Sequence, residues 1–339
     1  MNSCPKVSVI IPTYNCAKFL VEAVNSVRAQ KYQNYELIVV NDGSTDNTEE
    51  VLSQFRGQLV YLYQTNKGLP AALNAGLRAA TGELIAILDA DDLWHEEKLA
   101  RQVALMENCK ELGLCYTNFV PFGETANYRT GFDEQNGSLV CYERKPVGGD
   151  GYAITSKSFL KDLFVFQGSP KPSSVMFRRD CIEKVGFFDE TLTFCQDTQM
   201  SLRIAKYFAF GYVDQCLLFR RVRADSLGTA QSDRRYILEH IHMYETLDSW
   251  IPLTREERIA RNNVLAGYCL AAGYLDFSDD SLVSSRSHLW KSLRLSFSLK
   301  TLCYLILSLI PAPLLTILRR FKRQINEVKS KDLAPRTSL

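Results

Sequence analysis

The chain of 339 residues carries 40 basic and 38 acidic side chains, so its formal net charge is only +2. Hydrophobic residues make up 46% and charged residues 23%, which is typical of a globular protein and excludes a largely disordered or collagen-like chain. The near-neutral balance also argues against a nucleic-acid binder, which usually has a strong basic excess. The length indicates one large domain with an appendage, or two domains.

The ten cysteines are scattered between Cys4 and Cys303, with no CxxC pair and no histidine cluster, so a zinc site is not expected. The chain begins Met-Asn-Ser-Cys-Pro-Lys and enters a strand-like run at once. It lacks the basic start, apolar stretch and cleavage site of a secretory signal. We therefore expect a cytoplasmic protein with reduced thiols.

From residue 7 to about 117, short apolar runs alternate with segments of helical periodicity. The runs predict strands at 7–11, 35–40, 59–63 and 84–88, and the segments predict helices at 17–30, 69–80 and 96–108. This alternation is typical of a parallel sheet covered by helices. Because ligands bind at the carboxyl ends of the strands in such sheets, the residues after each run are the first candidates for chemistry.

The stretch 119–172 loses periodicity and gains Gly and Asn, which predicts an irregular surface segment. Beside a ligand-binding sheet edge, such a segment is more often a lid or acceptor loop than a linker. Helical periodicity returns at 180–185 and 197–207, and 212–219 predicts another strand. Beyond Arg234 the chain is predicted to be mostly helical.

The segment 302–318 is almost entirely apolar, but Pro311 and Pro313 interrupt it and Arg319-Arg320-Phe321-Lys322-Arg323 follows it. It is short for a membrane span, which needs about 20 apolar residues. Two interpretations of 300–323 stay open. The segment lies on an anionic membrane surface, or it is a helix that packs on the main domain.

Asp89-Ala90-Asp91-Asp92, directly after the predicted strand at 84–88, is the most informative string. A buried strand here delivers several carboxylates to one end, where their repulsion is costly without a positive partner. Mg²⁺ or Mn²⁺ is the natural partner, since both ions bind one or two carboxylates and complete their shells with water and phosphate oxygens. The alternative, a helix N-cap, needs only one of these carboxylates.

Two further strand ends are polar. Pro12-Thr13-Tyr14-Asn15 follows the first run, and Asn41-Asp42-Gly43-Ser44-Thr45-Asp46 follows the second. Together they can form a pocket for a base and ribose, in which Asp42 accepts a base N–H and Tyr14 supplies an aromatic wall. By itself the second string fits an ordinary strand-turn-helix joint.

Lys67 lies in Asn66-Lys67-Gly68, just before the predicted helix at 69–80. Its side chain can approach a phosphate beside the free N–H groups at the start of that helix. As a lone feature, this string is only a Gly-capped turn.

Together these strings resemble the inverting glycosyltransferases of family two, whose nucleotide-sugar domain has the GT-A fold. The resemblance runs from residue 7 to about 222 and includes Val-Ser-Val-Ile-Ile-Pro-Thr-Tyr-Asn, Asn-Asp-Gly-Ser-Thr-Asp, Asn-Ala-Gly, Leu-Asp-Ala-Asp-Asp, Ser-Ser-Val-Met-Phe-Arg-Arg and Val-Gly-Phe-Phe-Asp-Glu. It implies an α/β, GT-A (Rossmann-like) fold with a mixed, mostly parallel sheet flanked by helices and a C-terminal helical appendage. The implied domain spans 1–230, with a nucleotide-sugar half to about 117 and an acceptor half over 118–230. A helical region over 231–339 follows.

The resemblance also implies a donor site. The residues that would hold the nucleotide sugar belong to the strings above: Pro12, Thr13, Tyr14, Asn15, Asp42, Lys67, Asn74, Asp89 and Ala90. Asp91, the second Asp of the family's Asp-x-Asp motif, would hold the metal. Ala72-Leu73-Asn74 stands where relatives commonly have Ala-Arg-Asn, so the diphosphate is predicted to depend more on Lys67 or the metal.

In many relatives a Glu-Asp pair supplies the catalytic base, and Gln196-Asp197 corresponds to it here. The resemblance therefore implies Asp197 as the base and Gln196 near the acceptor. Arg221 and Arg223 lie in a segment where relatives often have a His, and they are predicted near the acceptor or the diphosphate. The simpler alternatives are that Asp197 caps the helix at 197–207, and that the arginines are exposed at a strand end.

The predicted function is metal-dependent, inverting transfer of a sugar from a nucleotide diphosphate donor to a hydroxyl of a glycan or lipid-linked acceptor, in cell-surface polysaccharide or glycolipid synthesis. The resemblance favours a UDP-sugar, with Mn²⁺ or Mg²⁺ as cofactor. The expected location is the cytoplasm, at the inner face of the plasma membrane if 300–323 binds lipid.

Two alternative functions stay open. One is a non-catalytic scaffold, against which the intact Asp89, Asp91 and Asp197 argue. The other is a nucleotidyltransferase, which would need a basic glycine-rich loop that 7–15 lacks.

Overall fold

The computed structural model describes residues 4–123, 143–155, 159–166, 170–223 and 234–310. The chain divides into two compact units between Arg261 and Asn262. The domain boundary expected from the sequence, at residue 230, lies earlier in the chain.

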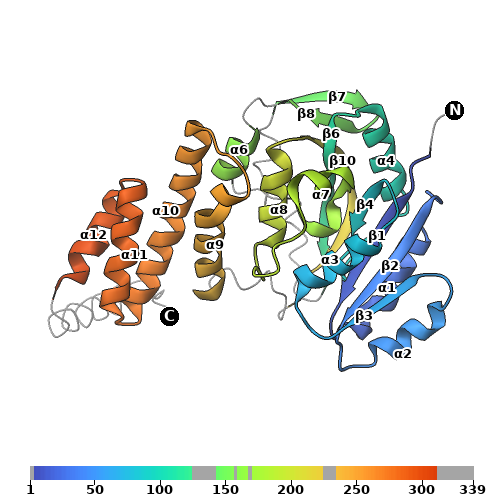
Figure 1. Cartoon of the computed structure of the whole chain (residues 1–339), viewed down its shortest axis with the longest axis horizontal. Helices are drawn as coiled ribbons and strands as arrows, with labels where there is room; N and C mark the ends of the chain where they lie inside the picture. Colours follow the sequence, from blue (N-terminus) through green and yellow to red (C-terminus); the bar gives the residue numbers. More distant parts are fainter. Residues whose placement is uncertain (1–3, 124–142, 156–158, 167–169, 224–233, 311–339) are drawn as a thin grey trace, which may run out of the picture. The chain divides into compact units, whose positions relative to one another are not determined.

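The first unit is built on one ten-stranded sheet with the order β3-β2-β1-β4-β9-β6-β10-β8-β7, in which β5 also pairs with β10 (Figure 1). Its parallel part consists of the first strands of the chain, β1 (Val7–Thr13), β2 (Tyr35–Asp42), β3 (Val60–Gln64) and β4 (Leu84–Ile87). The strands β1, β2 and β4 are almost entirely buried, which explains why they are continuous apolar runs. All four lie where the apolar runs predict strands.

The rest of the sheet is mixed. β6 (Leu112–Phe122) and β10 (Ala209–Arg221) pair in parallel. β9 (Met176–Arg178) lies between β4 and β6 and is antiparallel to both. The short β5 (Leu93–Trp94) pairs antiparallel with the end of β10. The prediction of a mixed sheet flanked by helices is confirmed, and β9 is the strand that joins its two halves.

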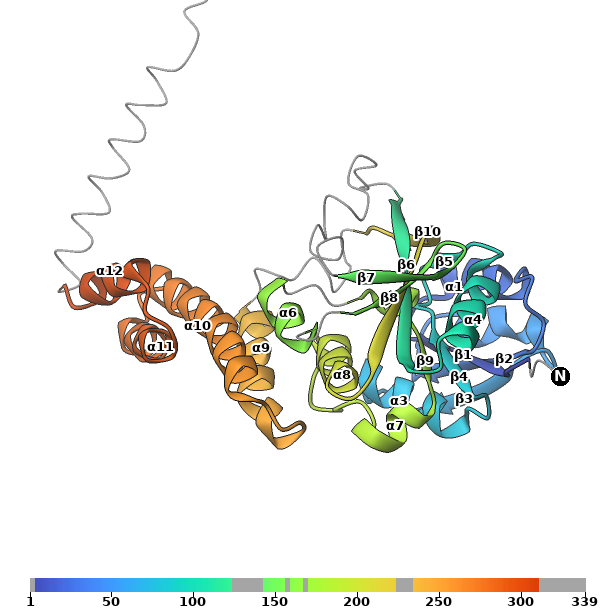
Figure 2. The same ribbon diagram turned by 90° about the horizontal axis from the view of Figure 1, so that it is seen from above.

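Helices cover both faces of this sheet. Figure 2 shows the sheet between α1 (Ala17–Arg28) and α4 (Lys98–Asn108) on one side and α3 (Leu69–Ala79) and α7 (Asp180–Val185) on the other. The short α2 (Thr48–Leu52) and a 3₁₀ turn (Ser53–Phe55) precede β3. α1 buries the apolar stripe Ala17, Leu20, Ala23, Val24 and Val27. Phe19, which lies beside this stripe in the sequence, is only half-buried.

The prediction of an irregular segment over 119–172 is wrong for much of the described part. β6 continues to Phe122, and a hairpin of β7 (Arg144–Gly148) and β8 (Gly151–Ile154) pairs with β10. Gly148 and Gly149 make its turn with positive φ angles of 130° and 53°. The helix α6 (Phe159–Phe166) and a 3₁₀ turn (Pro172–Ser174) follow. The glycines that suggested irregularity mark a tight turn between strands, and residues 124–142 lie outside the described part.

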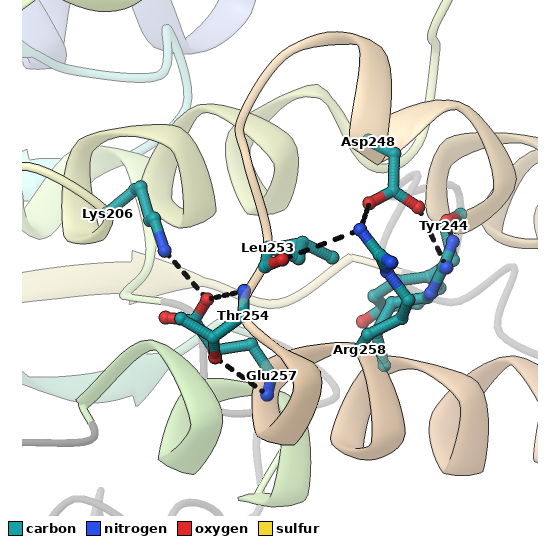
Figure 3. Close-up of polar contacts among 8 residues, drawn as sticks. Lys206, Tyr244, Asp248, Leu253, Thr254, Glu257 and Arg258 are labelled. Carbon is teal, nitrogen blue, oxygen red and sulfur yellow. Dashed lines mark hydrogen bonds and ion pairs between the residues drawn. The ribbon is translucent and has the colours of Figure 1, made fainter.

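Helices close the first unit. α8 (Gln196–Ala205) is followed, after β10, by α9 (Arg234–Thr246), a 3₁₀ turn (Leu247–Ser249) and the start of α10 (Arg255–Ser278). In Figure 3, Glu257 accepts hydrogen bonds from Lys206 Nζ at 2.7 Å and from the backbone N–H of Thr254 at 2.7 Å. The Thr254 hydroxyl accepts from the Glu257 N–H at 3.3 Å, which completes a capping box. The start of α10 is thereby tied to the end of α8.

We expect Glu257→Gln to lower the free energy of unfolding at pH 7 by about 1 kcal/mol, because Gln keeps the cap and loses the ion pair with Lys206. Burial opposes the charge of Glu257, but the bonds from Lys206 and Thr254 outweigh it and lower its pKa. Since a carboxyl with a lowered folded pKa stabilises above its unfolded pKa, this contribution should disappear as the pH falls through the folded value. Urea unfolding of both proteins at pH 7 and in acid measures it. The control is Glu256→Gln, since the Glu256 side chain is 77% exposed and its removal should change the free energy of unfolding little at either pH. If Glu257→Gln lowers that free energy by the same amount at pH 7 and in acid, the ion pair of Glu257 with Lys206 is not its cause.

The second unit continues α10 and adds α11 (Leu282–Leu295) and α12 (Leu299–Ser308), as the helical prediction for this region expects. Among the helices in the described residues, none is long and apolar enough to cross a membrane. Of the segment 300–323, only 300–310 is described.

Candidate functional site

The carboxyl ends of β1 and β2 bring the first two polar strings together. Thr13 pairs with Asn41 across the strands, and its buried Oγ1 has no hydrogen-bond partner among the described residues. Asn15 leaves the strand with a positive φ of 49°, and its Oδ1 accepts from the N–H of Thr45 at 2.7 Å. Tyr14 is 50% exposed beside this loop, whereas Pro12 is buried within β1. The end of β1 therefore brings an exposed aromatic side chain and an unsatisfied hydroxyl to the place where the pocket is predicted.

Asp42 organises the other side of this pocket. Its carboxylate accepts from Gln64 Nε2 at 2.7 Å and from the N–H groups of Lys67 and Gly68, both at 2.9 Å. Gly43, with a φ of +73°, allows this close approach because a Cβ there would lie 2.6 Å from the backbone nitrogen of Asn66. Lys67 thus enters the site through its backbone, while its side chain is exposed at the start of α3.

Asn74 lies on α3, 1% exposed, and connects this helix to the loop before α8. Its Nδ2 donates to the Phe188 carbonyl at 3.0 Å and to Glu190 Oε1 at 2.8 Å, and its Oδ1 accepts from the Phe188 N–H at 2.9 Å. In this structure the amide holds two segments of the protein together, and a contact between Asn74 and the donor stays a prediction.

The acidic string forms a turn after β4. The N–H of Asp92 donates to the Asp89 carbonyl at 3.0 Å, and the N–H of Asp89 donates to Ser173 Oγ at 3.0 Å. Ala90 is buried within the turn. Asp92 points inward and accepts from the Arg221 N–H at 2.8 Å, while burial and the nearby Asp91 raise its pKa to about 7. The third carboxylate therefore anchors the turn to β10, while Asp89 and Asp91 are only partly buried.

Both predicted arginines meet this turn. Arg223 Nε lies 3.1 Å from Asp91 Oδ2, and Arg221 Nε donates to the Asp91 carbonyl at 2.9 Å. The Arg221 guanidinium stacks on Phe19 and Phe122, with centroid distances of 4.6 and 4.5 Å. The half-buried Phe19 of α1 therefore supports an arginine of β10. Neither arginine is the isolated, exposed side chain of the simpler alternative.

Asp197 lies in the first turn of α8 and faces the same region from the opposite side. One largely apolar cavity is lined by Asp89, Gln196 and Asp197 together with side chains of α3, α8 and β9, among them Leu73, Phe177 and Met200. The N-cap of α8 is Cys195, and Asp197 accepts from the neighbouring Thr198 N–H at 2.8 Å. Two carboxylates more than 100 positions apart in the sequence thus line one cavity.

The electrostatics of the cavity favour a cation. Burial raises the pKa of Asp89 well above its usual range, and the negative charges of Asp92, Asp91 and Asp197 raise it further. Burial also raises the pKa of Asp197, although the nearby Lys171 acts in the opposite direction. This excess of negative charge fits a divalent cation at the Asp89–Asp91 turn. Within the described residues, no cluster of three or more His, Cys, Asp or Glu could hold a metal by itself, so such an ion would also need oxygen ligands from a donor or water.

The site contains three residues to which the sequence analysis assigned no individual role. Ser173 bonds Asp89 through its hydroxyl, and its carbonyl accepts from Trp94 Nε1 at 2.8 Å. Lys171 places a positive charge near Asp197, and Asp92 anchors the turn. The string Ser-Ser-Val-Met-Phe contains Ser173, but nothing in its local pattern indicates that it packs against a turn 84 positions away.

Residues 8–164 match the sequence profile of the family described as Glycosyl transferase family 2. This part of the chain belongs to that family. The chain is 44% identical over 115 residues to an uncharacterized glycosyltransferase of Nostoc sp., an alignment that covers 33% of this chain and 36% of that protein. It is 28% identical over 261 residues to an uncharacterized glycosyltransferase of Rickettsia prowazekii, covering 75% of this chain and 74% of that one.

Solved structures share the fold of this chain. Staphylococcus aureus TarS 1–349 in complex with UDP-GlcNAc matches with a TM-score of 0.55 and 20% identity, over 89% of this chain and 90% of that one. The mannosyltransferase PcManGT of Pyrobaculum calidifontis, in complex with GDP-Man and Mn²⁺, matches with a TM-score of 0.55 and 19% identity, over 89% and 79%. The prediction of a GT-A fold is confirmed.

Proposed function

We propose that this glycosyltransferase transfers a sugar from a nucleotide diphosphate donor to an acceptor hydroxyl with inversion at the anomeric carbon. The observation that carries the proposal is the shared cavity of Asp89 and Asp197. One carboxylate belongs to the turn after β4, at the ligand-binding edge of the sheet, and the other begins a helix that faces it. A donor at the turn would therefore present its sugar toward Asp197.

Asp197 is the proposed base. As the acceptor oxygen forms its bond to the anomeric carbon, the bond from that carbon to the diphosphate oxygen breaks, and Asp197 takes the hydroxyl proton. The electron pair of the broken bond leaves with the nucleoside diphosphate, so no covalent enzyme intermediate forms. A base in this role typically contributes about 100- to 10,000-fold in rate. The mostly apolar lining of the cavity limits competing water.

Asp91, with Asp89 beside it, is the proposed metal ligand. Bound Mn²⁺ or Mg²⁺ would offset the charge that grows on the leaving diphosphate. Arg223 already contacts the Asp91 carboxylate and is held beside Phe19, so its guanidinium is available near the same oxygens. We assign Arg223 and Arg221 to the diphosphate side of the site, and Gln196, which lines the cavity beside Asp197, to the acceptor side.

The proposed donor is a UDP-sugar. The adjoining ends of β1 and β2 would supply the aromatic side chain of Tyr14 and the carboxylate of Asp42 for a base, and the Thr13 hydroxyl would supply one further polar contact. TarS was solved with UDP-GlcNAc, whereas PcManGT was solved with GDP-Man. The two complexes support a nucleotide-sugar donor, and UDP is our choice between the bases.

We also propose that the acceptor is a glycan or a lipid-linked glycan of the cell surface, and that the protein works in the cytoplasm with 300–323 against the inner face of the plasma membrane. The cysteines in the described residues form no disulfide with one another, as expected in a reducing compartment.

A panel of nucleotide sugars tests this function. The purified full chain is incubated with each donor and Mn²⁺ or Mg²⁺, and released nucleoside diphosphate is measured. Metal-dependent release from one donor, most strongly from a UDP-sugar, is expected. If no donor binds and none is hydrolysed, the scaffold interpretation replaces the enzyme. Release of pyrophosphate from a nucleoside triphosphate would instead identify a nucleotidyltransferase.

A further inference from the structure

The helices of the second unit pack through small and polar side chains. Ser285, Ser292, Thr301 and Ser308 are each at most 1% exposed. Ser285 Oγ donates to the Gly273 carbonyl and Ser292 Oγ to the Ala266 carbonyl, both at 2.8 Å. At Gly273, a Cβ would lie 2.7 Å from Leu289 Cγ, so α10 and α11 approach closely there. Small residues that allow close backbone approach, with hydroxyls bonded across helices, are typical of helix packing in lipid.

The same helices present large apolar side chains outward. On α11 and just after it, Val283, Trp290 and Phe297 are 81%, 57% and 75% exposed. The spacing of seven residues places Val283 and Trp290 on one helical stripe of α11, and Phe297 lies two residues beyond the end of that helix. On α12, Leu299 and Ile306 repeat this spacing and are 68% and 55% exposed. A helix on a water-soluble domain normally has the opposite distribution, with its apolar stripe buried and polar residues outside.

Basic residues accompany these stripes. Arg294 is exposed four positions after Trp290, so these two side chains share a face of α11, and Lys300 is exposed beside Leu299. From residue 281 to 339 the chain has 11 Lys and Arg against 2 Asp and Glu, whereas residues 1–280 have 29 against 36. The near-zero net charge of the whole chain is therefore the sum of a net negative charge over residues 1–280, the acidic body, and a net positive charge over residues 281–339, the basic end.

We propose that the outward apolar stripes of α11 and α12 bind the interfacial region of an anionic lipid bilayer. Trp and Phe suit the boundary between headgroups and acyl chains, and Arg and Lys on the same face suit anionic headgroups. The charge of the basic end adds attraction to such a surface. The acidic body would be repelled by it, so contact is confined to this end. The binding requires neither donor nor turnover, so it can be tested whether or not the proposed transfer is correct.

Flotation of the full chain with vesicles tests the proposal. With vesicles of equal parts phosphatidylcholine and phosphatidylglycerol, the wild-type protein is expected to float, and with phosphatidylcholine alone binding should be much weaker. The variant Trp290→Ser/Phe297→Ser/Ile306→Ser removes three exposed side chains and should lower the partition coefficient at least about tenfold. Arg294→Glu/Lys300→Glu should also lower it at least about tenfold on anionic vesicles.

The controls are Ile259→Ser, an exposed apolar residue of the first unit, and Arg56→Glu, an exposed basic residue far along the chain from these stripes. Both should bind as the wild type does. Because every substituted side chain is exposed, thermal melting should change little, which separates lost binding from unfolding.

Tryptophan fluorescence provides a second readout. Brominated phosphatidylglycerol should quench the wild-type protein, and Trp290→Phe should lose most of that quenching, since Trp94 is buried and Trp250 belongs to the first unit. Wild-type flotation that the triple variant leaves unchanged would overturn the proposal. The proposal would also be overturned if the wild-type protein were a dimer that does not bind vesicles and the triple variant were a monomer. The stripes would then be covered by a second copy of the chain.

Discussion

Asp197→Asn should lower acceptor-dependent transfer by about 100- to 10,000-fold while leaving donor binding nearly unchanged. The amide keeps the size of the side chain and can still accept the hydrogen bond from the Thr198 N–H, but it cannot take a proton from the acceptor. Since Asp89 and Asp91 belong to the turn on the other side of the cavity, nucleotide affinity should not depend on this carboxylate.

The measurement is a comparison of kcat for transfer with the dissociation constant of the nucleoside diphosphate. Asp180→Asn is the matched control, because Asp180 also lies in the first turn of a helix of the acceptor half but is exposed. Transfer by Asp197→Asn at the wild-type rate would show that another group is the base. An equal loss of donor binding would show that Asp197 acts on the donor.

The raised pKa of Asp197 adds a pH dependence to this experiment. Burial disfavours the charged form, so the carboxylate that accepts the proton is lost at a higher pH than for a free Asp. Wild-type kcat should therefore fall on the acid side as Asp197 becomes protonated, and the residual activity of Asp197→Asn should lack that fall.

Asp91→Ala should weaken metal-dependent binding of the nucleoside diphosphate by about 100-fold or more, since interactions of a bound cation with phosphate oxygens contribute several kcal/mol. Asp92 cannot replace the Asp91 carboxylate, because Asp92 is buried and accepts a hydrogen bond from the Arg221 N–H. The substitution also removes the carboxylate oxygen that Arg223 Nε contacts. Transfer should fall with binding.

Titration calorimetry with Mn²⁺ present and absent measures this effect. Without metal, wild type and Asp91→Ala should bind the diphosphate with similar, weak affinity, so the difference between them should be the metal-dependent part. Asp180→Ala is the control for loss of an acidic side chain elsewhere. If Asp91→Ala keeps its metal-dependent gain in affinity, Asp91 is not the metal ligand.

Much of the first half of the fold could be predicted because its signals are local. The apolar runs that became β1, β2, β3 and β4 and the helical segments between them follow one another along the chain, and buried parallel strands have this composition. The polar strings after these strands could be placed at one edge by the same alternation, since parallel strands end on the same side.

The irregular segment predicted over 119–172 shows where local signals mislead. β7 and β8 span only five and four residues. They form strands because they pair with each other and because β8 also pairs with β10, which is distant in sequence. β9 consists of only three residues, Met176–Arg178. It becomes a strand because it pairs on both sides, with β4 and with β6. Periodicity cannot indicate strands this short.

The sequence by itself determined the alternating strands and helices of the first half, the acidic turn after a buried strand and the basic composition of the last 59 residues, because each is a property of neighbouring residues. Only the tertiary structure decided that Asp197 shares a cavity with Asp89, that Arg223 meets Asp91, and that Trp290 and Phe297 face outward while Ser285 and Ser292 are buried. These outcomes depend on which distant segments pack together, and burial and pairing across the fold are not encoded in any local pattern.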